Sequence, residues 1–453
     1  MRVAIATALF DDQQRIGSQR PRALASELAA LGHEVTVFTV GSGGDTSGMP
    51  PEVSVVRLGP LSWEDAPKTR WAGLTRKIRI AWAIAPTVLP LRAISRRAKA
   101  GSETTRDSAI LREIQQKRRS SITSIDAHEA TRRWLAQAKT RLTNALPSNS
   151  STGAEPAFDV VFSTFGPLGR LFRSEGFARS WIQDFRDPAS LSAFLPSVTR
   201  RILREQKALL AEADAITAVS AGVKDALVSS LPDANDKVTV LHNGFRKRLT
   251  GANRDLTPGP LKIGYVGAIY GERSKALTTF MSEVARLSAT SSGAFEVHYA
   301  GKDFATFSRC AQDAHIEELI HDHGELSHDG SLEMQAGMDA LLVLTWNTRQ
   351  SQGVLSGKFL EYLGADLPVI AMVTGEEPGS ELANLVRQLN IGICCEETGG
   401  DKDLVALREW LADATRARAE GAPVPFAPNT AEVAQFEYGQ IASRLAKLAE
   451  SLT

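Results

Sequence analysis

At 453 residues, the chain is long enough for two or three domains that each bury a core. Its 43% hydrophobic and 23% charged content is typical of a soluble globular protein, and its zero formal net charge gives no global indication of a nucleic-acid partner. Three cysteines, two of them adjacent in an apolar run, argue against a disulfide framework and favour a reducing compartment. The sequence predicts no signal peptide and no membrane-spanning segment.

The first residues form a predicted β-α-β unit. Residues 2–9 and 34–40 are typical of buried strands, and the leucines between them recur at helical spacing. Pro21 suits the first turn of that helix, and Gly32 suits its end. Because open α/β sheets meet ligands at the loop after the first strand, the turn around Gly17 is a candidate binding loop.

The segment from about 61 to 153 changes this pattern and predicts a helical insertion. Within it, residues 68–99 contain nine basic residues and no acidic one, interleaved with Trp71, Trp82 and aliphatic side chains. A basic, tryptophan-bearing amphipathic segment can lie in an anionic membrane interface. The alternative is a solvated helical insertion packed on the sheet, and amphipathicity alone leaves both interpretations open.

Polar residues gather at the end of a predicted strand that begins at Ser180. This strand runs into Asp184-Phe-Arg-Asp-Pro188, so Asp184, Arg186 and Asp187 are expected at the rim where open α/β sheets bind ligands. Two carboxylates that flank a guanidinium can orient a substrate hydroxyl. The alternative is an ion-pair network that caps the loop, and a metal site is less favoured because no other ligand lies nearby in the sequence.

The division into domains follows from a polar run rich in glycine and proline at 246–260, which predicts a linker. It separates a first domain, residues 1–245, from a second, residues 261–430. The second domain starts with an apolar strand, a loop from Gly267 and a helix with apolar residues at helical spacing. Residues 431–453 are expected to form a final helix.

Four histidines between residues 315 and 328 raise a metal site as an alternative. They include the run His321-Asp-His323, but the spacing fits no standard zinc pattern and the ligand set is incomplete. The sequence therefore favours a helix followed by a loop at 324–327, and we assign no metal ligand.

The most informative stretch begins at Gly353. This glycine and Gly357 bracket a short loop before a predicted helix over about 358–363, which Gly364 is expected to end. A helix N-terminus binds anions, because its first N–H groups lack partners and its dipole is positive there. Lys358 adds a cation, and the carboxylate of Glu361, one turn later, suits a ribose diol better than a phosphate. The stretch predicts a sugar-nucleotide site, and the alternative is an ordinary loop-helix-strand connection.

The run from Ser356 to Glu361 resembles the donor-binding segment of family-4 retaining glycosyltransferases with the GT-B fold. In that family a Glu-x7-Glu pattern precedes a strand of the Pro-Val-Ile-Ala kind. Glu361 matches the second glutamate, which the resemblance places on the donor ribose, whereas Gly353 stands where the first would be. The sequence is closer to a subgroup that reads Gly-x-x-Ser-Gly-Lys-x-x-Glu, so Ser356, Gly357 and Lys358 are implied donor-site residues.

The first domain carries a second part of the resemblance. The run from Asp184 to Pro188 is similar to the Asp-Phe-Arg-Asp-Pro-Trp signature of the same subgroup, with Ala189 in place of the tryptophan. It implies catalytic, acceptor-side roles for Asp184, Arg186 and Asp187. The turn at Gly17 is implied to face the acceptor and the donor phosphates.

The second domain carries further implied donor residues. The resemblance implies that the loop at Gly267 and the side chain of Arg273 bind the donor diphosphate, although Ala268 stands where a second cation is expected. Lys275 and Lys358 are the two alternatives for that cation. It also implies that the loop around Leu326 packs against the nucleobase. The final helix, 431–453, is implied to cross back to the first domain.

The resemblance implies an α/β chain of the GT-B type, with two Rossmann-like doubly wound domains, an interdomain cleft and a helical insertion in the first domain. The implied reaction moves a sugar from a UDP- or GDP-sugar to a saccharide or lipid-linked acceptor with retention, in bacterial cell-surface polysaccharide or glycolipid synthesis. No cofactor, metal or nucleic acid is expected. The expected location is cytoplasmic, at the inner face of the cell membrane where the basic segment binds it. A sugar-nucleotide epimerase and a non-catalytic nucleotide-sugar-binding subunit stay open as alternatives.

Overall fold

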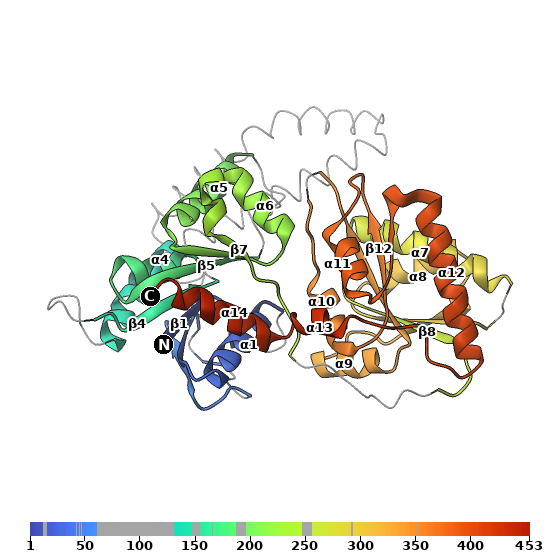
Figure 1. Ribbon diagram of the computed structural model, residues 1–453, viewed down its shortest axis with the longest axis horizontal. Helices are drawn as coiled ribbons and strands as arrows, with labels where there is room; N and C mark the ends of the chain where they lie inside the picture. Colours follow the sequence, from blue (N-terminus) through green and yellow to red (C-terminus); the bar gives the residue numbers. More distant parts are fainter. Residues whose placement is uncertain are drawn as a thin grey trace, which may run out of the picture.

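The computed structural model contains two parallel β-sheets, each with its own helices, that lie beside one another (Figure 1). The residues that it describes are 1–11, 16–41, 43–44, 46, 48–60, 131–146, 155–164, 166–186, 196–246, 256–290, 293–349 and 351–453. The basic segment 68–99 and most of the predicted linker therefore lie outside the described residues. Within the described ranges, no helix has the length and apolar composition to cross a membrane.

The first sheet has seven strands in the order β3-β2-β1-β4-β5-β6-β7, and every described pair is parallel. Its strands are β1 (Arg2–Thr7), β2 (Glu34–Thr39), β3 (Val53–Arg57), β4 (Phe158–Ser163), β5 (Ala178–Phe185), β6 (Ala215–Ala218) and β7 (Val238–Val240). Its helices are α1 (Ile16–Ala30), a helix over 131–145, α4 (Gly166–Ser174), α5 (Pro196–Glu212) and α6 (Ala221–Ser230), with a 3-10 turn, η2 (Pro232–Lys237).

The second sheet has six parallel strands in the order β10-β9-β8-β11-β12-β13. Its strands are β8 (Leu261–Val266), β9 (Phe295–Ala300), β10 (Ile320–Asp322), β11 (Ala340–Trp346), β12 (Val369–Thr374) and β13 (Gly392–Glu396). Its helices are α7 (Glu272–Ser288), α8 (Phe304–Asp313), α9 (His328–Ala336), α10 (Gly357–Ala365), α11 (Glu381–Leu389) and α12 (Gly400–Ala419), with 3-10 turns η3 (Glu317–Leu319) and η4 (Glu397–Gly399).

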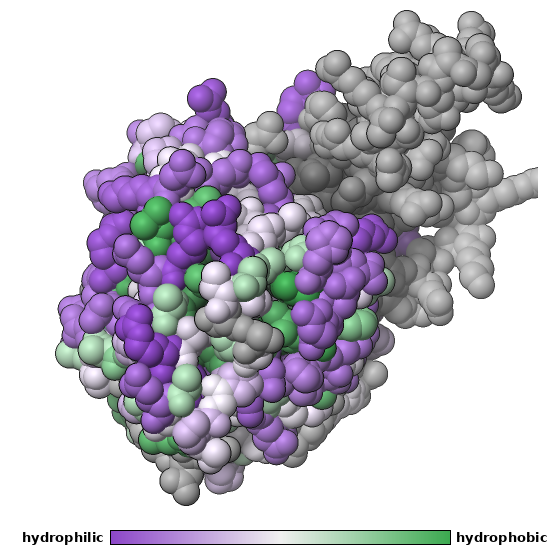
Figure 2. Space-filling view, turned by 90° about the vertical axis from the view of Figure 1, so that its right-hand side faces the viewer, coloured by the Kyte–Doolittle hydropathy of each residue, from purple (hydrophilic) through white to green (hydrophobic). Residues whose placement is uncertain are grey.

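Burial on both faces explains why the strands read as continuous apolar runs. All six residues of β12 are buried, because helices cover a parallel sheet on both sides. One core cluster of the second sheet includes residues of α7, α8 and α12, and the other includes residues of α9, α10 and α11. Figure 2 shows the end of this domain farthest from the first, where hydrophilic residues cover most of the surface and hydrophobic ones form small separate patches.

Three details of the predicted helices are wrong. The segment before the loop at 324–327, which the sequence favoured as a helix, is the 3-10 turn η3 followed by the strand β10. Pro21 lies inside α1 rather than in its first turn, because the helix already begins at Ile16. Gly364 lies inside α10 and does not end it; the helix continues to Ala365, and Asp366 follows in the left-handed conformation. Gly364 instead allows close packing, since a Cβ there would lie 3.1 Å from the side chain of Phe245.

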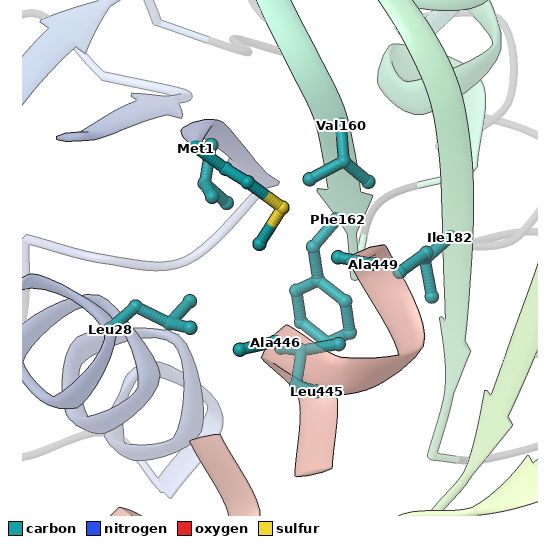
Figure 3. A pocket seen from close by; sticks show the side chains of 9 residues that line it. Met1, Leu28, Val160, Phe162, Ile182, Leu445, Ala446 and Ala449 are labelled. Atoms are coloured by element: carbon teal, nitrogen blue, oxygen red, sulfur yellow. The ribbon is translucent and has the colours of Figure 1, made fainter. Parts of the chain in front are cut away.

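The chain passes between the two domains twice, and the two passages run side by side. The backbone of Phe245 accepts from the N–H of Tyr438 at 3.0 Å and donates to Phe436 O at 3.1 Å. Before this pairing, α13 (Thr430–Ala434) lies on the second domain, and after it α14 (Tyr438–Glu450) lies on the first (Figure 1). Figure 3 shows α14 packed on the first sheet, where it encloses a small cavity. The cavity of about 10 Å³ is lined by Leu445, Ala446 and Ala449 of α14 and by Met1, Val3, Leu28, Val160, Phe162 and Ile182.

Candidate functional site

The strand order of the second sheet reverses between β8 and β11. The chain runs outward from β8 to β9 on one side and from β11 to β12 on the other. The loops that follow β8 and β11 therefore leave toward opposite faces, and ligands bind open α/β sheets in the crevice outside such a point. Loop 267–271 follows β8 and loop 347–356 follows β11 into α10, and we call the space expected between them the crevice.

The N-terminus of α10 holds the predicted donor-site residues together. Ser356 is the N-cap, and its Oγ accepts from the N–H of Phe359 at 3.2 Å. In the first turn of the helix, Lys358 Nζ donates to Glu361 Oε1 at 2.9 Å. Gln335 Nε2, from α9, donates to the same carboxylate oxygen at 2.6 Å. The carboxylate of Glu361 thus points to α9 and stays one-fifth exposed.

Arg273 lies at the start of α7, on the other side of the crevice. Its guanidinium lies over the rings of Tyr270 and Trp346, with its Cζ 4.7 and 5.6 Å from their centroids. Its Nη1 donates to Ala268 O at 3.1 Å, and its buried Nε has no hydrogen-bond partner among the described residues. Burial raises the pKa of Tyr265 to about 12, so its hydroxyl stays protonated and donates to the same carbonyl.

Gly267 and Leu326 belong to neighbouring loops of this crevice. Gly267 has a φ of 136°, a backbone conformation that would be strained in a residue with a side chain. Its carbonyl accepts a hydrogen bond from the hydroxyl of Tyr299 at 3.1 Å. Leu326 is 38% exposed. Its loop ends at the start of α9, where His328 Nδ1 lies 3.7 Å from Glu361 Oε2. The structure therefore places the loop of Leu326 close to Glu361.

The loop around Gly353 touches the first domain at the N-terminus of α6. A Cβ at Gly353 would lie 2.4 Å from the Cα of Gly222, and the glycine has a φ of 67°. Ser220 Oγ donates to Gly353 O at 2.9 Å. The carboxylate of Glu381, at the start of α11, accepts from the N–H groups of Ala221 and Gly222 at 2.8 and 3.0 Å. A glutamate at position 353 would not fit this contact, and the carboxyl ends of the two sheets face each other here.

The structure brings two of the predicted first-domain residues together. Arg186 follows β5, and its Nη1 donates to Gly17 O at 3.1 Å. Within α1, that carbonyl would normally accept from residue 21, but Pro21 has no N–H. Arg186 thus supplies the missing donor and ties β5 to α1. Asp187 lies outside the described residues.

Asp184 does not have the acceptor-side position at the rim that we expected. Its side chain is inaccessible to solvent, as is almost all of that of Arg20. Arg20 Nε and Nη2 donate to the two carboxylate oxygens at 3.1 and 2.9 Å, and Thr217 Oγ1 donates to one of them at 2.7 Å. A carboxylate enclosed in this way cannot contact an acceptor substrate. Asp184 is a positioning residue that holds Arg20 between β5, β6 and the chain after β7.

Comparison with known families identifies the chain. The model of the glycosyl transferase 4-like domain matches residues 17–244, which is about half of the chain. The chain belongs to this family. The protein is accordingly a glycosyltransferase, and its two doubly wound domains have the predicted GT-B fold. No curated protein sequence matches it.

Solved structures similar to this glycosyltransferase share its whole length but little of its sequence. A sucrose-phosphate synthase from Thermosynechococcus elongatus has 15% identity and a TM-score of 0.58, with 100% of this chain and 99% of that one covered. A UDP-forming trehalose-phosphate synthase from Burkholderia xenovorans has 13% identity, a TM-score of 0.54 and coverages of 100% and 99%. WaaG, a lipopolysaccharide glycosyltransferase, has 15% identity, a TM-score of 0.52 and coverages of 99% and 99%.

Several residues of the glycosyltransferase site were not predicted from the sequence. Tyr270 and Trp346 hold Arg273, Gln335 holds Glu361, and Glu381 joins the domains. The positions of Tyr270 and Trp346 at the carboxyl ends of β8 and β11 were the available signal. Gln335 carried no such signal, because it lies within a helix that meets α10 only in the folded domain.

Proposed function

We propose that this glycosyltransferase moves a sugar from a nucleoside-diphosphate sugar to a saccharide or lipid-linked acceptor, with retention, in the synthesis of bacterial cell-surface polysaccharide or glycolipid. The observation that carries the proposal is the N-terminus of α10, where Ser356, Lys358 and Glu361 meet beside the strand-order reversal. A similar structure from E. coli, with a TM-score of 0.57, is bound with UDP-2-fluoro glucose. A UDP- or GDP-sugar is accordingly the proposed donor.

The donor diphosphate is proposed to bind the backbone N–H groups at Gly357 and the two nearby cations. Arg273 lies on one side of the crevice and Lys358 on the other, so the diphosphate would receive positive charge from both. Lys358 would then turn from Glu361 toward the phosphates, which leaves the Glu361 carboxylate to accept from the ribose diol. Donors that face the leaving diphosphate stabilise the charge that develops on it. This step assigns no cofactor to the chain.

The acceptor is proposed to bind at the first domain, at Arg186 and Asp187. Arg186 is tied to Gly17, so the turn after β1 and the loop after β5 form one side of the site. Asp184 contributes from beneath by holding Arg20. A donor phosphate oxygen is proposed to take the acceptor proton, so the chemistry needs no strong protein base.

Turnover of a panel of UDP-, GDP- and dTDP-sugars, with and without acceptor glycans, tests the proposal. Glu361→Ala should reduce donor use by about 30- to 1000-fold, since two charge-assisted hydrogen bonds contribute roughly 2–4 kcal/mol. Glu333→Ala, which removes an exposed carboxylate from α9, is the matched control and should change little. Unchanged donor affinity in a folded Glu361→Ala protein would contradict the proposed donor site. Formation of epimerised donor would favour an epimerase. Nucleotide binding without any turnover would favour a non-catalytic subunit.

The proposed setting is the cytoplasmic face of the membrane, which a lipid-linked acceptor requires the enzyme to reach. The support is the sequence of residues 68–99, whose basic side chains would contribute ~1 kcal/mol each near an anionic surface. Sedimentation with liposomes tests this proposal. Binding should need anionic lipid and fall with added salt, and absence of binding to anionic liposomes at low salt would refute it.

A further inference from the structure

Three histidines and a glutamate meet on the two outermost strands at one edge of the second sheet. β9 and β10 are parallel, and His321 pairs with His298 across them. Because side chains alternate between the faces of a strand, Glu296 and His298 share a face of β9, and His321 and His323 share the same face at β10. We call Glu296, His298, His321 and His323 the glutamate–histidine cluster.

The side chains of this cluster lie within reach of one another. His298 Nε2 lies 3.2 Å from Glu296 Oε2, and His298 Nδ1 lies 2.9 Å from His323 Nε2. The rings of His298 and His321 stack with their centroids 4.6 Å apart. Ligand atoms of Glu296, His298 and His321 lie within 4.8 Å of one another, and no other group of the described residues meets that criterion.

We propose that Glu296, His298 and His321 bind a divalent transition-metal ion of the zinc type, and that His323 orients His298. Imidazole nitrogen with carboxylate oxygen is a ligand set that suits zinc, and three protein ligands leave a fourth position for water. With Zn–N bonds of about 2.0–2.1 Å, two ligand atoms of a tetrahedral site lie about 3.3–3.4 Å apart. The Glu296 and His298 atoms already have nearly this separation.

The remaining ligands are placed so that a metal can complete the site. His321 is exposed, so its side chain can change rotamer, and its ligand atom would have to move by at most about 1.5 Å to reach tetrahedral spacing, since all three ligand atoms lie within 4.8 Å of one another. His298 is 9% exposed, which limits its movement. Its Nδ1 faces His323 Nε2, so with Nε2 on the metal the Nδ1–H donates to His323. A hydrogen bond of this kind fixes the tautomer and orientation of a metal-bound imidazole.

This proposal departs from the interpretation of the sequence alone. The spacing of His321 and His323 fits no zinc pattern because two of the three ligands come from the preceding strand. Only the register of β9 with β10 reveals the set, since it places His298 directly beside His321. The sequence alone does not reveal this register, because β9 and β10 come together only in the folded sheet.

The position of the site suggests what the metal would do. β10 has three residues and pairs only with β9 among the described strands, so it is weakly held. It leads through His323 into the loop of Leu326. A metal that joins β9 to β10 would fix the base of this loop. The loop of Leu326 is proposed to pack against the nucleobase of the donor, so an effect of the metal on nucleobase binding rests on the proposed function. Metal binding itself does not rest on it.

Zinc binding to the untagged full chain tests the proposal. After treatment with a chelator and its removal, isothermal titration with Zn²⁺ alone should show one site per chain, and the cobalt-loaded protein should show the visible absorption of four-coordinate cobalt. His323→Ala should weaken zinc binding by about 10–100-fold, and His321→Ala, which removes a ligand, by more. His321 is exposed, so its variant should fold, and circular dichroism confirms that.

The matched control is His315→Asn, because His315 lies outside the cluster and asparagine tolerates its φ of 57°. It should bind zinc as the unmodified chain does. The proposal is overturned if the chain binds no zinc, or if His321→Ala and His298→Ala bind it as tightly as the control. The titration contains no nucleotide, so failure of the donor proposal would leave its result intact.

Discussion

Replacing Asp184 by asparagine should strongly destabilise the first domain. The change keeps the shape of the side chain but removes the charge that Arg20 faces, and both side chains are shielded from solvent. Arg20 also donates to Leu241 O and His242 O at 2.9 and 2.6 Å, so its guanidinium cannot turn toward water without breaking these bonds. An uncompensated buried charge costs about 3–5 kcal/mol.

Asp159→Asn is the matched control, because Asp159 pairs with Arg2 at 3.0 Å on the same sheet but at partly exposed positions. Such pairs contribute about 0–1 kcal/mol. For a domain of this size, 3–5 kcal/mol corresponds to a fall in melting temperature of roughly 6–20 °C. Calorimetry measures the fall, and hydrogen exchange in β5 and β6 shows that the first domain is responsible. If Asp184→Asn melts within a few degrees of Asp159→Asn, the reasoning about the buried pair is refuted.

The remaining predictions concern the crevice and the contact between the domains. Lys358→Ala and Arg273→Ala should each weaken binding of a nucleoside diphosphate much more than binding of the nucleoside, and calorimetry showing equal effects would mean that neither cation touches the phosphates. Asp187→Asn should lower turnover at saturating donor and leave nucleotide affinity intact; a collapse of nucleotide affinity with unchanged turnover would contradict its acceptor-side role. Glu381→Gln should loosen the contact with α6, because a neutral amide interacts more weakly than a carboxylate with a helix N-terminus. Small-angle scattering should then show a larger radius of gyration, and an unchanged radius would mean that other contacts hold the domains together.

Local signals in the sequence were enough to predict the helix after Gly357 and the motif that it carries. The helix predicted over about 358–363 is present, because its N-cap, Ser356, acts within three residues along the chain. The contact between Lys358 and Glu361 was readable for the same reason, since residues three apart share a helix face. The resemblance carried by this motif implied two doubly wound domains, and the two parallel sheets confirm them.

Contacts between distant parts of the chain were decided only by the tertiary structure. Asp184 was predicted at the rim of the sheet with an acceptor-side role, but its partner Arg20 lies 164 positions earlier and encloses it. Gly353 read as a lost glutamate, whereas the fold shows it pressed against Gly222 of the other domain. A periodic pattern tells which face a side chain occupies but not which strand or domain will face it. Strand order, register and the packing of the two domains decide which strand or domain faces a given side chain, and they arise only when the whole chain is folded.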